Sequence, residues 1–175
     1  MKKFTIIALS ALTMSAYAAQ SSMPPNEALK IFQISGLGDQ AFANEGGFSK
    51  KFDPKNLSLE HCIKLDGEKL CATTSIKSAT DINGDKQPEI VVIDDAHSTY
   101  HYGNTGTAFA LLTKTKTGYR LIADGIGIPS FLKTKGKNGY PDLEVGGLGF
   151  CFAVLRYNGA QYQYHRREYD GKACD

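Results

Sequence analysis

The sequence predicts a mainly β, β-rich α+β fold: a small antiparallel sheet or sandwich of two repeated β units, with an N-terminal helix and two disulfides. From Leu57 onward, short apolar runs alternate with Asp-Gly, Asn-Gly and Gly-Tyr dipeptides, a pattern typical of antiparallel strands joined by turns. One arrangement of loop and strands occurs twice, and all four cysteines lie in the same region. We therefore expect residues 57–175 to form a β-rich domain that packs with 24–56 as a single unit.

The first 18 residues have the organisation of a secretory signal peptide. Lys2 and Lys3 precede a mostly apolar segment, and Ala16-Tyr17-Ala18 is a small-x-small cleavage site. We expect cleavage after Ala18 and a periplasmic protein, with secretion as the alternative. No other apolar stretch is long enough to span a bilayer.

The charge of the chain argues against nucleic acid as a partner. The formal net charge is +2, and Lys2 and Lys3 of the signal segment account for it. The remaining chain is neutral, whereas binding to phosphates needs a clustered basic surface.

Residues 19–56 are expected to hold one helix followed by an irregular connection. Asn26 is a suitable N-cap for a helix that runs to about Ser35. Gly36 and Gly38 then end the helix. Its apolar side would be formed by Leu29, Ile31, Phe32 and Ile34.

The even number of cysteines in an exported chain predicts two disulfides. Cys62 and Cys71 flank a segment with Asp66-Gly67 at its centre, the dipeptide preferred by two-residue hairpin turns. Counting outward from that turn places the two cysteines opposite each other at a non-hydrogen-bonded pair, a separation that a disulfide tolerates. Cys151 and Cys174 then pair by elimination.

An internal repeat covers most of the β-rich region. Each copy consists of an Asn-Gly turn, a strand that begins with Pro and an acidic residue, a Phe-Ala strand, and a Gly and Tyr signal for the third strand. The first copy has about ten extra residues between its first two strands. The matching segments are 83–92 with 109–119, and 138–145 with 152–162. Two copies are too few for a closed propeller, so we expect adjacent antiparallel units.

The loop at 81–89 has the composition of a cation site. Side-chain oxygens of Asp81, Asn83, Asp85 and Glu89 alternate along it, and the carbonyl of Gln87 would add another ligand. Hard cations such as Ca²⁺ prefer this mixture of oxygens. Two interpretations stay open: a weak Ca²⁺ site, or a metal-free turn whose side chains accept hydrogen bonds from backbone N–H groups.

This loop and the strand behind it resemble the FG-GAP repeat of integrin-like propellers and related bacterial exported proteins. The resemblance covers roughly residues 79–122 and, more weakly, 134–165. It implies a loop that binds Ca²⁺ and supports the fold, without a catalytic role. Two positions depart from the pattern, because Lys86 replaces the usual Gly and Glu89 the usual Asp. The second copy has lysines where carboxylates are expected, so at most one such cation site is predicted.

The extra residues of the first copy form the second candidate site. The side chains of interest are Asp94, Asp95, His97, Tyr100, His101 and Tyr102. The spacing of His97 and His101 suits two imidazoles on one face, which could hold Zn²⁺ or Cu²⁺. The alternative is an exposed hairpin tip. Asp95, His97, Tyr100, His101 and Tyr102 would then contact a partner, since binding residues concentrate on such loops.

These features favour binding over catalysis. The chain has no Gly-x-Ser-x-Gly motif, and no cysteine remains as a nucleophile once two disulfides form. We expect a non-enzymatic periplasmic binding protein, specifically an inhibitor or immunity protein against an exported hydrolase or toxin. One alternative is a Ca²⁺-stabilised structural module of a surface assembly. Another is a metal-dependent enzyme or metal-handling protein that uses His97 and His101.

Overall fold

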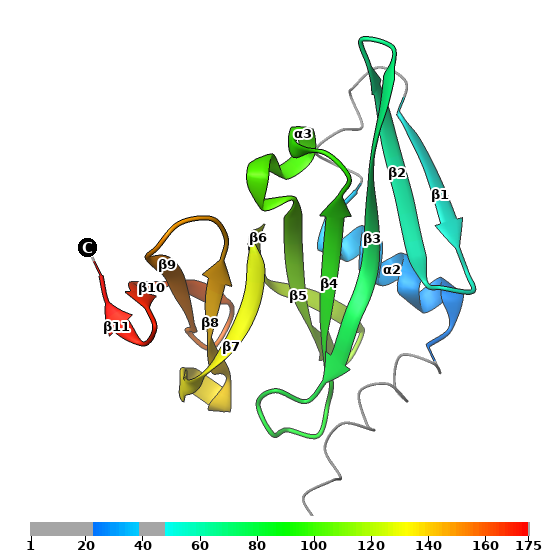
Figure 1. The fold of residues 1–175 in the computed structure, drawn as a ribbon. Helices are drawn as coiled ribbons and strands as arrows, with labels where there is room; N and C mark the ends of the chain where they lie inside the picture. Colours follow the sequence, from blue (N-terminus) through cyan, green and yellow to red (C-terminus); the bar gives the residue numbers. More distant parts are fainter. Residues whose placement is uncertain (1–22, 39–47, 175) are drawn as a thin grey trace, which may run out of the picture.

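The computed structural model describes residues 23–38 and 48–174, and within them the predicted fold class is confirmed. The chain forms two antiparallel sheets, one helix of three turns and two disulfides (Figure 1). The predicted signal peptide and its cleavage site lie outside the described residues. Of the described helices, none is long and apolar enough to cross a membrane.

Helix α2 spans Pro25–Ser35 and so begins two residues earlier than the sequence suggested. Pro24, not Asn26, occupies the N-cap position, and no side chain caps the helix there. Pro25 can begin the helix because its fixed φ is already helical and its missing N–H would have no partner in the first turn. Gly36 ends the helix in a left-handed conformation with φ 69°.

Sheet A has six strands in the order of the sequence. The region 36–56 was expected to be irregular, but its end forms strand β1, which pairs with β2. The sequence did not predict this strand, because Lys50 and Lys51 make it a charged edge strand without an alternating apolar pattern. The strands are β1 (Ser49–Asp53), β2 (Ser58–Leu65), β3 (Glu68–Thr80), β4 (Glu89–Ala96), β5 (Thr107–Thr115) and β6 (Gly118–Ile126).

Sheet B has five strands in the order β11-β10-β9-β8-β7. Gly127, with φ 142°, joins β6 directly to β7 and so connects the two sheets. A Cβ atom on Gly127 would lie 2.5 Å from the carbonyl oxygen of Gly146, so only glycine fits there. The strands are β7 (Ile128–Lys135), β8 (Pro141–Gly146), β9 (Phe152–Tyr157), β10 (Tyr162–Tyr169) and β11 (Lys172–Ala173).

The hydrophobic core has two parts, one on each face of sheet A. On one face, helix α2 buries Ala28, Ile31 and Phe32 against the sheet. On the other face, β4, β5 and β6 pack against tyrosines and Leu143 of sheet B. The result is three layers, helix on sheet on sheet. The two copies of the repeat lie in different layers: β4–β6 in sheet A and β8–β10 in sheet B.

Both predicted disulfides are confirmed. Cys62 lies opposite Cys71 in the β2–β3 hairpin, in the register set by the Asp66-Gly67 turn. Both turn residues have positive φ, 50° and 87°, as a type I′ turn requires. Cys151 and Cys174 join the loop after β8 to the C-terminal end of the chain.

Removal of the C-terminal disulfide should destabilise the protein more than removal of the hairpin disulfide. The separations are 23 residues for Cys151–Cys174 and nine for Cys62–Cys71. Loop-closure entropy therefore predicts losses of about 3.4 and about 2.6 kcal/mol in the free energy of unfolding. Urea unfolding of the two double Cys→Ser variants checks this order, and the reverse order would contradict it.

Candidate functional site

The loop between β3 and β4 is held by hydrogen bonds from its own backbone to its side chains. Asp81 accepts the N–H groups of Gly84, Asp85 and Lys86 at 2.7, 3.1 and 2.8 Å. Asn83 Oδ1 accepts Asp85 N–H at 2.9 Å. Asp85 Oδ1 accepts the N–H of Gln87 at 2.8 Å. Local burial opposes ionisation of Asp81, but these N–H donors outweigh it and hold its pKa below the usual range.

Glu89 was expected to be a ligand of this loop, but its side chain lies in the core. It is only 1% exposed. Its carboxylate accepts the N–H of Ile82 at 3.1 Å and the hydroxyls of Thr113 and Tyr140, each at 3.0 Å. Burial raises its pKa, although these donors partly offset the effect. Of the predicted ligand side chains, those of Asp81, Asn83 and Asp85 therefore remain at the exposed turn.

The extra residues of the first repeat fold into helix α3 (Thr99–Tyr102) and the 3-10 turn η1 (Gly103–Thr105), at the upper end of β4 and β5 in Figure 1. A buried polar cluster lies beneath them. His61 Nε2 is 2.9 Å from both carboxylate oxygens of Asp94. Thr74 donates to Asp94 Oδ1 at 3.0 Å, and the Tyr102 hydroxyl donates to Oδ2. His61, Thr74 and Asp94 are each 0% exposed.

Burial and hydrogen bonding shift the pKa values of Asp94 and Tyr102 in this cluster. Burial opposes ionisation of Asp94, but hydrogen bonds from His61, Tyr102 and Thr74 outweigh it and keep its pKa below the usual range. The pKa of Tyr102 is raised by burial and by the Asp94 charge. Gly38 closes the cluster, because a Cβ atom there would lie 2.8 Å from Thr74 Oγ1. Asp94 thus acts as a buried acceptor that anchors α3 through Tyr102.

The residues expected to contact a partner divide into two groups. Asp95, His97 and Tyr100 are exposed. His101 and Tyr102, expected on the surface, are buried, because Tyr102 reaches Asp94 and the His101 ring packs 5.7 Å from His61. Burial and the neighbouring His61 also lower the pKa of His101.

The structure does not support a shared metal shell for the two predicted histidines. His97 Nε2 lies 3.5 Å from Thr73 Oγ1 at the surface, whereas His101 is in the buried cluster. Within the described ranges, three His, Cys, Asp or Glu ligand atoms come within 4.8 Å of one another only at Glu60, Cys62 and Cys71. Both of these cysteines are in the disulfide and offer no thiolate.

Exposed apolar side chains, which the sequence analysis did not single out, lie beside the α3 segment. A Cβ atom on Gly147 would be 3.6 Å from Thr105 Oγ1, so the β8–β9 loop touches η1. In that loop Leu148 is 70% and Phe150 78% exposed. Ile128, 55% exposed, is paired with Gly146 at the start of the same loop. In the sequence, this exposed surface is indicated only by Leu148 and Phe150 within a Gly-rich segment that was expected to form a turn.

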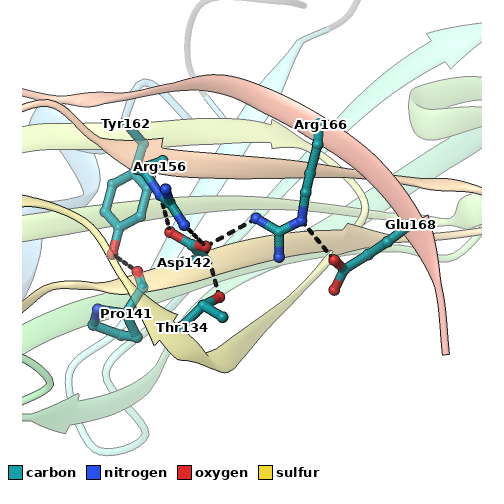
Figure 2. Close-up of polar contacts among 7 residues, drawn as sticks. All are labelled: Thr134, Pro141, Asp142, Arg156, Tyr162, Arg166 and Glu168. Carbon is teal, nitrogen blue, oxygen red and sulfur yellow. Dashed lines mark hydrogen bonds and ion pairs between the residues drawn. The ribbon is translucent and has the colours of Figure 1, made fainter. Parts of the chain in front are cut away.

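On the outer face of sheet B, an ion-pair network surrounds Asp142 (Figure 2). Its carboxylate, 0% exposed, accepts two hydrogen bonds from Arg156 at 2.8 and 2.7 Å. It also accepts one from Arg166 at 3.0 Å and one from Thr134 at 2.6 Å. Arg156 is the main cause that holds the pKa of Asp142 far below its usual range, against the opposing effect of burial. Arg166 continues the network to Glu168 at 2.7 Å.

No protein-family model, curated protein or solved structure matches this chain.

The turn at Asp81 should hold without metal. Asp81→Ala removes the acceptor of three backbone N–H groups, so it should lower the thermal midpoint in EDTA more than Asp85→Ala, which removes the acceptor of Gln87 N–H. Melting curves with EDTA and with calcium test this. An effect of Asp81→Ala seen only in calcium would show that a cation holds the turn.

Asp142→Asn should destabilise the protein at neutral pH by about 2 kcal/mol, because the buried carboxylate loses its charge-assisted hydrogen bonds to two partly exposed arginines. The folded state holds the pKa of Asp142 below the unfolded value, so the stability from this carboxylate is present above about pH 4 and is lost as the pH falls below it. The difference between wild type and variant should therefore shrink on acidification. Urea unfolding from neutral to acidic pH measures it.

The matched control for that series is Asp124→Asn, since Asp124 is exposed. It should change the free energy of unfolding by no more than about 0.5 kcal/mol at any pH. A pH-independent deficit in Asp142→Asn would contradict the electrostatic explanation.

Proposed function

We propose that the protein is a non-enzymatic periplasmic binding protein that contacts another exported protein with the end of the molecule that carries α3. The observation that carries the proposal is the exposure of Leu148, Phe150 and Ile128, in and beside the loop that contacts η1. Exposed apolar side chains that gather at one place on a small protein mark interaction surfaces. Aromatic residues supply most of the affinity at such surfaces.

Contacts that hold α3 and the β8–β9 loop in place favour recognition of a partner. Tyr102 anchors α3 to buried Asp94, and the Cys151–Cys174 disulfide holds the chain next to Phe150. Phe150 also packs edge-on against Tyr169, with ring centroids 5.8 Å apart. Contacts held in place before binding reduce the entropy cost of association. The two disulfides fit an oxidising, exported location.

The specific form of this proposal is an inhibitor or immunity protein against a cell-envelope hydrolase or toxin. The exposed rings of Tyr100 and Phe150 would suit insertion into the cleft of such an enzyme. Asp95 and His97 would give the polar rim of the contact. The buried His61–Asp94 pair holds the tip in this proposal and does not meet a substrate.

Site-specific cross-linking in the envelope tests the proposal. A photoreactive amino acid placed at Tyr100 or Phe150 should capture one and the same exported hydrolase or toxin, and the double variant Leu148→Ser, Phe150→Ser should lose it. The control position is exposed Lys116, in the β5–β6 turn. Equal capture from Lys116, or a partner retained by the double variant, would contradict the proposed surface.

A further inference from the structure

A second surface lies at the opposite end of sheet B, beside the 3-10 turn η2 (Lys137–Gly139). There the end of β7, the end of β9 and the start of β10 border an open groove of about 470 Å³. This volume is within the range of small-ligand sites. Its lining includes Lys135, Lys137, Arg156, Asn158, Gln163 and Tyr164.

The groove is strongly basic. Lys135, Lys137, Arg156 and His165 line it, and none of the described residues that line it is acidic. Asp142, the carboxylate that pairs with Arg156, is fully buried and already accepts hydrogen bonds from two arginines and Thr134 (Figure 2). The positive charge of Lys135 and Lys137 is therefore left to attract an anion.

Arg156 is held in a fixed orientation at this groove. Its Nε and one terminal nitrogen bind the two oxygens of Asp142, and the side chain remains 38% exposed. A guanidinium fixed by a bidentate pair presents its outer edge to a ligand with little loss of side-chain entropy. Gly136 lets the backbone between Lys135 and Lys137 approach β9 closely. A Cβ atom at this position would lie 2.7 Å from the Tyr157 carbonyl oxygen and 3.0 Å from Arg156 Cγ.

The remaining lining residues suit a sugar. Tyr164 exposes 64% of its surface, a flat amphipathic ring beside the cations. Gln163 and Asn158 add side-chain amides, which both donate to and accept from hydroxyl groups. Asn158 uses its oxygen for the N–H groups of Ala160 and Gln161, at 2.8 and 2.9 Å, so its amide nitrogen can donate.

We infer that this groove binds carboxylate-bearing sugar units of an acidic glycan. Lys135, Lys137 and Arg156 would pair with the carboxylates, and the Tyr164 ring would cover one sugar face. The groove is open along the surface, which suits a unit within a polymer better than an enclosed small molecule. This site is separate from the α3 end and its test does not depend on the proposed partner.

Calorimetric titration with tri-galacturonic acid tests the inference directly. Wild-type protein should bind it, and binding should weaken as NaCl is raised, because salt screens exposed charges. A neutral trisaccharide and a hexapeptide of glutamates should each bind about tenfold more weakly. No binding of tri-galacturonic acid, or tighter binding of the peptide, would overturn the proposal.

Matched variants locate the site. Lys135→Gln together with Lys137→Gln should weaken binding by about tenfold, since charge-assisted hydrogen bonds are lost. Tyr164→Ser should also weaken it. Lys133→Gln changes an exposed lysine of the same strand outside the groove and should stay within about twofold of wild type. Equal losses in Lys133→Gln would place the binding elsewhere, and melting curves confirm that each variant is folded.

Discussion

A buried carboxylate at the start of a strand holds each of the two repeated loops, and the arrangement of both sheets depends on this contact. Glu89 and Asp142 each follow a proline and reach back to the beginning of their own loop. Glu89 binds Ile82 N–H at 3.1 Å, and Asp142 binds the Thr134 hydroxyl at 2.6 Å. Both carboxylates are almost wholly buried, so each needs several donors to offset its lost hydration.

The two carboxylates differ in what they bind beyond the loop, and this difference separates the two halves of the molecule. Glu89 lies between the sheets and binds Tyr140, which ties sheet B to sheet A. The two loops touch, because a Cβ atom on Gly139 would lie 2.7 Å from the Asn83 carbonyl oxygen. Asp142 points to the outer face and binds arginines instead. One repeat thus builds the interface between the sheets, and the other builds a charged surface.

Features of the fold that depend on short-range rules are predictable from the sequence. The Asp66-Gly67 turn sets the register that brings Cys62 to Cys71, and both positions are close in the chain. The partners of His61 are not predictable in this way, since Asp94 is 33 residues away. Burial of His61 is indicated by its place between Leu59 and Ile63 on the apolar side of β2. Glu89 was expected to be a ligand of the loop, because composition alone does not distinguish a metal ligand from a buried hydrogen-bond acceptor.

The second repeated loop differs from the first in how its turn is held. In the first loop, Asp81 and Asp85 accept N–H groups and hold the turn. In the second loop backbone carbonyls take that role: the Tyr140 oxygen accepts Gly136 N–H at 2.8 Å, and the Lys137 oxygen accepts Tyr140 N–H at 3.3 Å. Gly136 and Tyr140 therefore stand where the first loop has Asp81 and Asp85, and the neighbouring Lys135 and Lys137 border the groove. A loop that resembles a degenerate calcium site is therefore, by charge, suited to an anion.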